Sequence, residues 1–194
     1  MRTTPLLFIA TSLALAGGVS AQTAPSDGGA SPVDASAPAP PGARERFAGA
    51  TFVYAGDASE RAAIESAIEY GIDDFNFITR PIARGRLRDT TRPYPSLRFS
   101  FENGRIEVAA PGYHTFSTPG DGTAAAWVNL EGDTTSLTQR IASANRILQA
   151  ISTDQGGRNN VFILSPDNRA LTVRSTVHSP RLTHSIVFTL TYRR

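Results

Sequence analysis

The chain has 194 residues, of which 40% are hydrophobic, and a formal net charge of only +2 at pH 7. It contains no cysteine and no lysine, so disulfide bonds and a lipid-carrying cysteine are excluded and every long basic side chain is an arginine. So small a net charge gives no support to general nucleic-acid binding, and we expect no nucleic-acid partner.

Residues 1–21 have the pattern of a secretory signal peptide. Arg2 supplies the positive start, residues 6–16 form an apolar run, and residues 19–21 are the small residues of a cleavage site. We therefore expect cleavage near Ala21 and a mature protein that is periplasmic or secreted.

Residues 22–43 are rich in Ala, Pro, Ser and Gly and contain no aromatic residue. Such a segment buries too little surface to fold, which predicts a disordered tether. Residues 44–194 are one domain's length and are sufficient for one sizeable core. We expect this domain to be a monomer.

The folded part is predicted to begin with a strand over residues 47–54, followed by a helical segment over 58–88. Asp57 and Glu60 resemble a capping box at the start of that segment. Gly71 is expected to divide it into two helices, and Pro81 to kink the second helix or to start a new turn. Apolar residues on helical spacing predict one buried stripe: Ile64, Ala67, Ile68, Ile72, Phe75, Ile78 and Ile82.

Residues 97–109 carry the clearest local signal in the chain. Asn103 and Gly104 are the preferred pair for a two-residue hairpin turn, because both positions need a positive φ. In that register Phe101 lies opposite Ile106, and Phe99 lies opposite Val108. All four then share one apolar face, so a shift of one residue would expose both phenylalanines.

Alternating apolar and polar residues continue from residue 113 to residue 192, with short connections suited to turns. Short connections favour a meander, in which each strand pairs with the next. A meander of this length removes its unpaired edges most simply by closing. The fold class is therefore predicted to be mainly β, an antiparallel meander that closes into a barrel of about ten strands, with one or two helices after the first strand.

One strand, a helical pair and about nine meandering strands is the element order of fatty-acid-binding proteins. Residues 47–49 also resemble the opening shared by lipocalins and that family, and residues 137–157 look like the adjacent strands near the middle of those barrels. The resemblance implies a calycin-like β-barrel over about residues 47–192.

Two departures limit what the resemblance implies. Thr51 or Phe52 stands where the family has a tryptophan in its opening motif. The family also places an arginine two residues before the tyrosine of the last strand, to hold a carboxylate, whereas this chain has Leu190 before Tyr192. The resemblance therefore implies the barrel and does not imply a fatty acid.

Several apolar residues are expected to face the interior of this barrel. They either line a ligand cavity or fill a dry core, and the small residues at 124–126 favour a cavity. The candidate ligand-binding residues are Phe99, Phe101, Ile106, Val108, Trp127, Phe188 and Tyr192.

Arg80, Arg84 and Arg88 are four residues apart and share one helix face. If the helices cap the barrel mouth, this face would attract an anionic ligand or an anionic membrane surface. The alternative is a solvated face paired with the acidic residues of the same segment.

No catalytic motif is present, so we expect a protein that is not an enzyme and that uses no cofactor. His178 and His184 flank one turn, but no further ligands lie near them, and we assign no metal site.

The leading interpretation is a binding protein for a small apolar or amphipathic ligand, with the helical segment as a lid. The alternative is a cell-envelope scaffold with a filled core and no ligand. An outer-membrane barrel is a third interpretation, disfavoured because the strands are short and the chain ends in Arg193 and Arg194.

Overall fold

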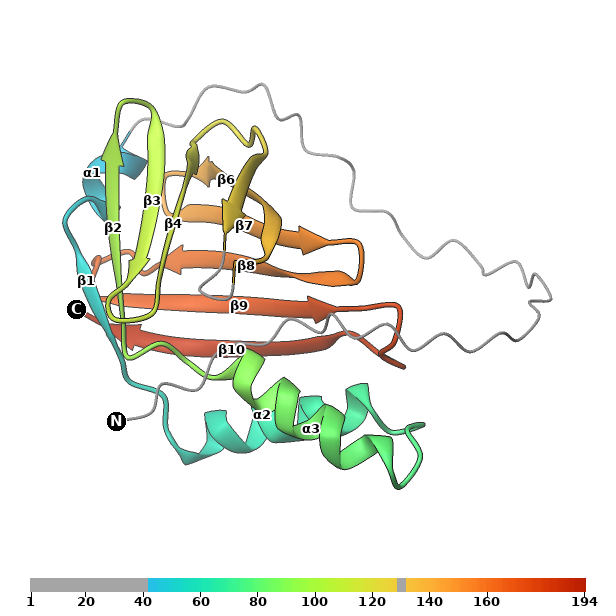
Figure 1. The fold of residues 1–194 in the computed structure, drawn as a ribbon. Helices are drawn as coiled ribbons and strands as arrows, with labels where there is room; N and C mark the ends of the chain where they lie inside the picture. Colours follow the sequence, from blue (N-terminus) through green and yellow to red (C-terminus); the bar gives the residue numbers. More distant parts are fainter. Residues whose placement is uncertain (1–41, 129–131) are drawn as a thin grey trace.

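The computed structural model describes residues 42–128 and 132–194, which form three helices and ten strands (Figure 1). The predicted signal peptide and all but the last two residues of the predicted tether lie outside the described residues. The elements are α1 (Ala43–Phe47), β1 (Thr51–Tyr54), α2 (Ala58–Gly71), α3 (Thr79–Thr91), β2 (Ser96–Glu102), β3 (Arg105–Ala110), β4 (His114–Pro119), β5 (Ala125–Val128), β6 (Thr134–Ser143), β7 (Arg146–Thr153), β8 (Gly156–Leu164), β9 (Ala170–His178) and β10 (Ile186–Arg193).

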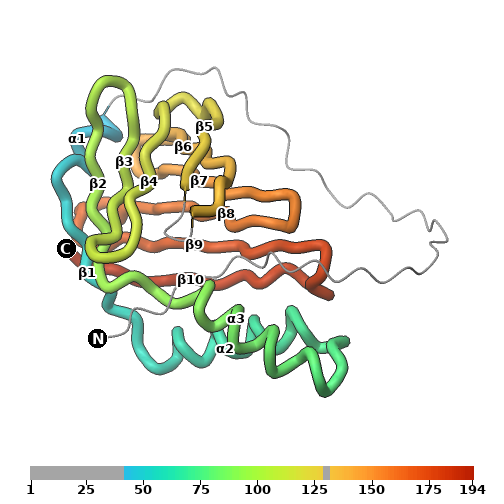
Figure 2. Tube along the Cα trace, viewed as in Figure 1, coloured from blue at the N-terminus to red at the C-terminus, as the bar shows by residue number. Residues whose placement is uncertain are grey.

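The ten strands form one antiparallel sheet in the order β4-β3-β2-β1-β10-β9-β8-β7-β6-β5. From β1 to β4, and again from β5 to β10, each strand pairs with the next one along the chain. The pairing of β1 with β10 joins these two series. The sheet curls so that its two outer strands, β4 and β5, approach each other (Figure 2). The chain thus forms the predicted antiparallel meander of ten strands, curled into a barrel, with the helical pair α2–α3 after the first strand.

The barrel is nearly closed between β4 and β5, which share no ladder of backbone hydrogen bonds among the described residues. Side chains and the connecting turn bridge this gap. Trp127 Nε1 on β5 donates to the Thr115 carbonyl on β4 at 2.9 Å, and Gly122 N donates to the Gln139 carbonyl on β6 at 3.0 Å.

The β2–β3 hairpin has the predicted register. Phe99 pairs with Val108 and Phe101 with Ile106, and the turn residues Asn103 and Gly104 have φ values of 50° and 76°. Positive φ at both positions matches the right-handed twist of the flanking strands. Phe99 is fully buried by this register.

Helix α2 begins and ends where local chemistry predicts. Asp57 Oδ1 accepts a 2.9 Å hydrogen bond from Glu60 N, so the predicted cap is present. The helix buries Ile64 and Ile68 and ends at Gly71. A side chain at Gly71 would meet Ile186 of β10 at 2.7 Å, so the glycine permits the close approach of α2 to the barrel.

Helix α3 differs from the prediction of one continuous buried stripe. Ile78 and Ile82 are 63% and 56% exposed, because the turn after α2 rotates the second helix away from the barrel. Asn76 Oδ1 accepts from Thr79 N at 2.9 Å, and Pro81 lies in the first turn, where its missing N–H costs nothing. Pro81 thus starts a new helix and does not kink one.

The predicted opening strand over residues 47–54 is partly wrong. Phe47 ends helix α1, and the strand begins only at Thr51, because Gly49 turns the backbone with a φ of 68°. The fully buried Phe47 ring lies 5.3 Å from the Phe99 ring, which in turn lies 5.3 Å from the Phe162 ring. Helix α1 thereby packs an aromatic cluster into the barrel end opposite α2 and α3.

Candidate functional site

The residues that the sequence assigned to the barrel interior divide into two groups. Phe99, Ile106 and Val108 of the β2–β3 hairpin are at most 1% exposed, and Phe99 belongs to the aromatic cluster at the α1 end. Phe101 and Trp127 are only partly buried. Phe188 and Tyr192 of β10 are buried and lie nearer to the polar interior described next.

The interior contains a buried cation, Arg158 of β8, which is only 7% exposed. Its guanidinium carbon lies 5.4 Å from the centre of the Phe188 ring, a cation–π distance. Nη1 donates at 3.0 Å to the carbonyl of Thr90, in the last turn of α3. Helix carbonyls at that end carry partial negative charge, so α3 stabilises the cation.

Arg158 has no carboxylate partner within residues 42–128 and 132–194. Its side-chain partners are neutral: Nε donates to Asn160 Oδ1 at 2.9 Å, and Nη2 donates to Ser175 Oγ at 3.1 Å. Burial lowers the pKa of the guanidinium, but arginine keeps its proton because its ordinary pKa is so high. The interior therefore holds a positive charge that no carboxylate of the described residues neutralises, which is rare in folded proteins.

A ladder of polar side chains extends from Arg158 across neighbouring strands. Asn160 accepts from Ser175 Oγ of β9 at 2.7 Å and donates through Nδ2 to Gln149 Oε1 of β7 at 2.8 Å. Gln149 pairs in register with Gln139 of β6, whose Oε1 accepts from Thr118 Oγ1 of β4 at 3.1 Å. The polar groups thus cross the wall from β9 to β4 at about one level of the barrel.

Apolar side chains surround this ladder. Val173 and Val177 of β9, Ile147 and Ile151 of β7, and Phe188 of β10 are all buried at neighbouring inward positions. Burial also raises the pKa of Tyr192, against the nearby charge of Arg158. The site therefore combines one cation, several fixed dipoles and an apolar wall, a set suited to an amphipathic anion.

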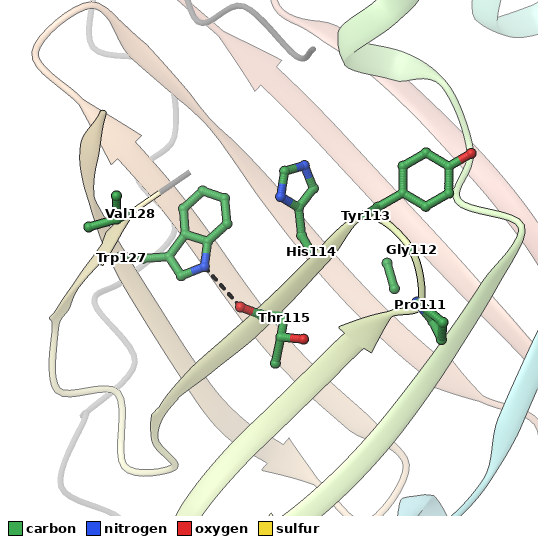
Figure 3. A pocket seen from close by; sticks show the side chains of 8 residues that line it. Pro111, Gly112, Tyr113, His114, Thr115, Trp127 and Val128 are labelled. Atoms are coloured by element: carbon green, nitrogen blue, oxygen red, sulfur yellow. Dashed lines mark hydrogen bonds between the residues drawn. The ribbon is translucent and has the colours of Figure 1, made fainter. Parts of the chain in front are cut away.

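An open pocket of about 350 Å³ lies at the seam between β4 and β5, formed by the β3–β4 turn, the start of β4 and the end of β5 (Figure 3). His114 stands between Trp127 and Tyr113 in this view, and its ring lies 5.4 Å from that of Trp127. Burial lowers the pKa of His114, which favours the neutral imidazole.

Tyr94 connects this pocket to the region of Arg158. Its ring contacts those of Tyr113, His114 and Phe116, at 5.6, 6.0 and 6.5 Å. Burial raises the pKa of Tyr94, and the positive charge of Arg158 acts in the opposite direction. The aromatic side chains at the seam between β4 and β5 are thus neighbours of the buried Arg158 guanidinium.

The three arginines singled out in the sequence lie on α3 and face α2. Arg84 forms two hydrogen bonds with Glu69, and Arg80 Nη2 lies 3.3 Å from Glu69 Oε2. Arg88 binds Glu65 through Nη2 at 2.7 Å. These pairs join the two helices, and the two carboxylates neutralise part of the charge of the three arginines.

The two histidines that flank the β9–β10 turn are not brought together into a metal site. His184 stacks on Tyr70 at 4.1 Å, and its Nε2 lies 3.9 Å from Asp73. His178 lies beside Gly157. The described part of the chain contains no group of three or more potential metal ligands, and it contains no helix long and apolar enough to span a bilayer.

Sequence reasoning missed Arg158, Asn160 and Gln149, although strand parity places the first two on the inward face of β8. Phe162 is buried on β8, and counting back by two along the same strand places Asn160 and Arg158 on the same inward face. Residue type gives no reason to place Arg158 inside, because arginine is usually exposed.

No known protein family matches the chain, and no curated protein is detectably related to it. Solved structures of similar arrangement include a fatty acid binding protein of Schistosoma mansoni in complex with arachidonic acid, at 13% identity and a TM-score of 0.45, covering 79% of this chain and 98% of that one. The wild-type fluorescent protein UnaG is similar at 15% identity and a TM-score of 0.45, covering 77% and 98%. A zebrafish ileal bile acid-binding protein complexed with cholic acid has 12% identity and a TM-score of 0.43, covering 77% and 98%.

Proposed function

We propose that this barrel binds an amphipathic small molecule through an anionic head group, and that Arg158 holds that head group. The observation that carries the proposal is the burial of this guanidinium without a carboxylate partner among the described residues. A buried cation without a counter-ion destabilises a fold. A bound anion would neutralise this charge and so stabilise the protein.

The surroundings of Arg158 support a ligand that is apolar beyond its head group. Phe188, Val173 and Val177 are buried beside the cation and offer an apolar wall to a hydrocarbon or ring skeleton. Leu190, which stands where the fatty-acid-binding proteins that the sequence resembles carry an arginine, is also buried. In this chain the cation comes from β8 and not from the last strand.

We infer that α2 and α3 act as a lid over this site. Thr90 of α3 accepts a hydrogen bond from Arg158 Nη1, so an anion that takes over this donor would release the end of the helix. The ion pairs between α2 and α3 would let the two helices move as one unit. The signal-peptide pattern of residues 1–21 supports placing this activity in the periplasm or outside the cell.

Contact with an anionic membrane is a further part of the proposal. Because Glu65 and Glu69 bind Arg80, Arg84 and Arg88, those charges are only partly available to lipid. Phe77, at 86% exposed, and the neighbouring Ile78 and Ile82 would supply the apolar contact from the tip of the helical pair.

The proposal is tested with a long-chain carboxylic acid and the alcohol of equal chain length, both titrated against the purified protein. We expect the acid to bind at least tenfold more tightly, because only the acid offers a charge to Arg158. Equal affinities would contradict the assignment of an anionic head group. Binding of neither molecule, together with no retained small molecule in native mass spectrometry, would favour the alternative of a scaffold with a filled core.

A further inference from the structure

We propose that Gln149, with Gln139 beside it, forms a second polar subsite that recognises a hydroxyl or keto oxygen in the middle of the ligand. The inference rests on the proposed function, since it concerns the same ligand whose anionic head group Arg158 holds. The ligand class is then an oxygenated amphipathic acid rather than an acid with an unsubstituted chain.

The orientation of the Gln149 amide follows from its neighbours. A guanidinium can only donate, so the atom of Asn160 that receives Arg158 Nε must be the oxygen, Oδ1. Asn160 Nδ2 is then the donor to Gln149, at 2.8 Å, and the atom that accepts must be Oε1. These hydrogen bonds therefore fix the orientation of the Gln149 amide and leave its Nε2 as a donor.

Gln149 Nε2 and Gln139 Nε2 are both buried, and neither has an acceptor in the part of the chain that the structure describes. The two residues are 3% and 0% exposed and stand opposite each other on β7 and β6. Side chains in register on neighbouring strands start only about 5 Å apart. The two amides thus form one local group of donors, and buried donors of this kind are normally satisfied.

The subsite lies within reach of a ligand held by Arg158. Strands β6 and β8 are separated only by β7, so their backbones lie about 10 Å apart. Ile147 and Ile151 flank Gln149 at the neighbouring inward positions of β7 and are buried. A ligand oxygen that reaches Gln149 is therefore recognised in apolar surroundings. A ligand that lacks this oxygen would leave the buried Gln149 amide without a partner, which strongly disfavours its binding.

The test compares a mid-chain hydroxy fatty acid with the unsubstituted acid of the same length, by calorimetric titration of the full mature chain. We expect the wild type to bind the hydroxy acid about fivefold or more tightly, the effect of one net hydrogen bond. Gln149→Met should remove this preference and leave the affinity for the plain acid within about twofold. Gln155→Met, in the exposed β7–β8 turn, is the matched control and should keep the preference.

The outcomes separate this inference from the proposed function. Equal binding of the two acids by the wild type, or an unchanged preference in Gln149→Met, overturns the second subsite and leaves the Arg158 assignment intact. Arg158→Met should weaken the binding of both acids, because both lose the contact with their head group. If Gln149→Met does not fold, the test rests on the ratio of the affinities for the two acids, measured in the wild type and in Gln139→Met. A wild-type ratio of one overturns the inference.

Discussion

Arg158 Nη1 donates a 3.0 Å hydrogen bond to the carbonyl of Thr90, so a cation inside the barrel is bonded directly to the end of α3. The partial negative charge of the helix terminus replaces part of the counter-charge that Arg158 otherwise lacks. An anion that displaces this carbonyl would free the end of α3. Under the proposed function, ligand binding and the position of the helical pair would therefore be coupled through one guanidinium.

Arg158→Met is expected to leave the free energy of unfolding within about 1 kcal/mol of the wild type, or to raise it, because replacing a buried charge by an apolar side chain removes its desolvation cost. Denaturation in urea, followed by circular dichroism, measures this difference. A loss of about 3 kcal/mol or more would instead assign Arg158 a purely structural role.

Strand parity, combined with the usual exposure of charged and amide side chains, predicts most of the barrel but not its polar interior. The Asn103–Gly104 turn and the alternation around Phe99 and Phe101 fix the β2–β3 hairpin, because a slip would expose apolar surface. Arg158 could not be recognised by residue type, since arginine is usually exposed. Its place depends on hydrogen bonds to residues from α3 and β9 that only the folded chain brings together.

The helical segment illustrates a second limit of sequence reasoning. The apolar spacing is helical through Ile82, yet only the α2 part of that stripe is buried. The spacing of apolar residues predicts which face of a helix is apolar, but it does not predict what packs against that face. The turn at Asn76 directs Ile78 and Ile82 away from the barrel. The aromatic cluster around Phe47 was missed because Gly49 separates a short helix from β1.

Two glycine-to-alanine substitutions should change stability in opposite directions. Gly104→Ala is expected to cost about 1 kcal/mol, because the hairpin turn requires a positive φ that alanine disfavours. Gly85→Ala, in the interior of α3 with open space around it, should stabilise by up to about 1 kcal/mol through helix propensity. Urea denaturation of both variants tests the turn and the helix independently, and shifts of the same sign would contradict this account.

The ion pairs between α2 and α3 should make stability depend on pH through Glu69. The hydrogen bond from Arg84 holds the pKa of Glu69 below its ordinary value. A lowered pKa means that the stabilisation is present above the unfolded pKa and is lost as the pH falls through the folded one. Glu69→Gln should therefore lower the Tm at neutral pH, with a difference that shrinks as the pH falls from about 6 to about 3.

Glu102→Gln is the control for that experiment, because Glu102 is exposed and makes no ion pair among the described residues. It should not reproduce the pH-dependent difference. A constant difference for Glu69→Gln across the range would show that the amide disturbs packing rather than charge.

Membrane contact is expected to depend on the exposed tip of the helical pair. Replacing Phe77 and Ile82 by serine should reduce association with anionic vesicles by about tenfold or more, since two large apolar contacts are lost. Val187→Ser, at an exposed position on β10, is the matched control and should change little. Cosedimentation with vesicles at low and moderate salt measures the effect, and no association by the wild type would rule out this role.

The central claim, that Arg158 holds an anionic head group, is tested most directly by the affinities of Arg158→Met and Arg174→Met for a long-chain carboxylic acid. Arg174 lies on the outer face of β9 and is exposed, so its substitution makes an equal change in charge outside the barrel. We predict that Arg158→Met loses at least tenfold in affinity for the acid and none for the matching alcohol, whereas Arg174→Met retains both. Equal affinities of the two variants for the acid would contradict the account.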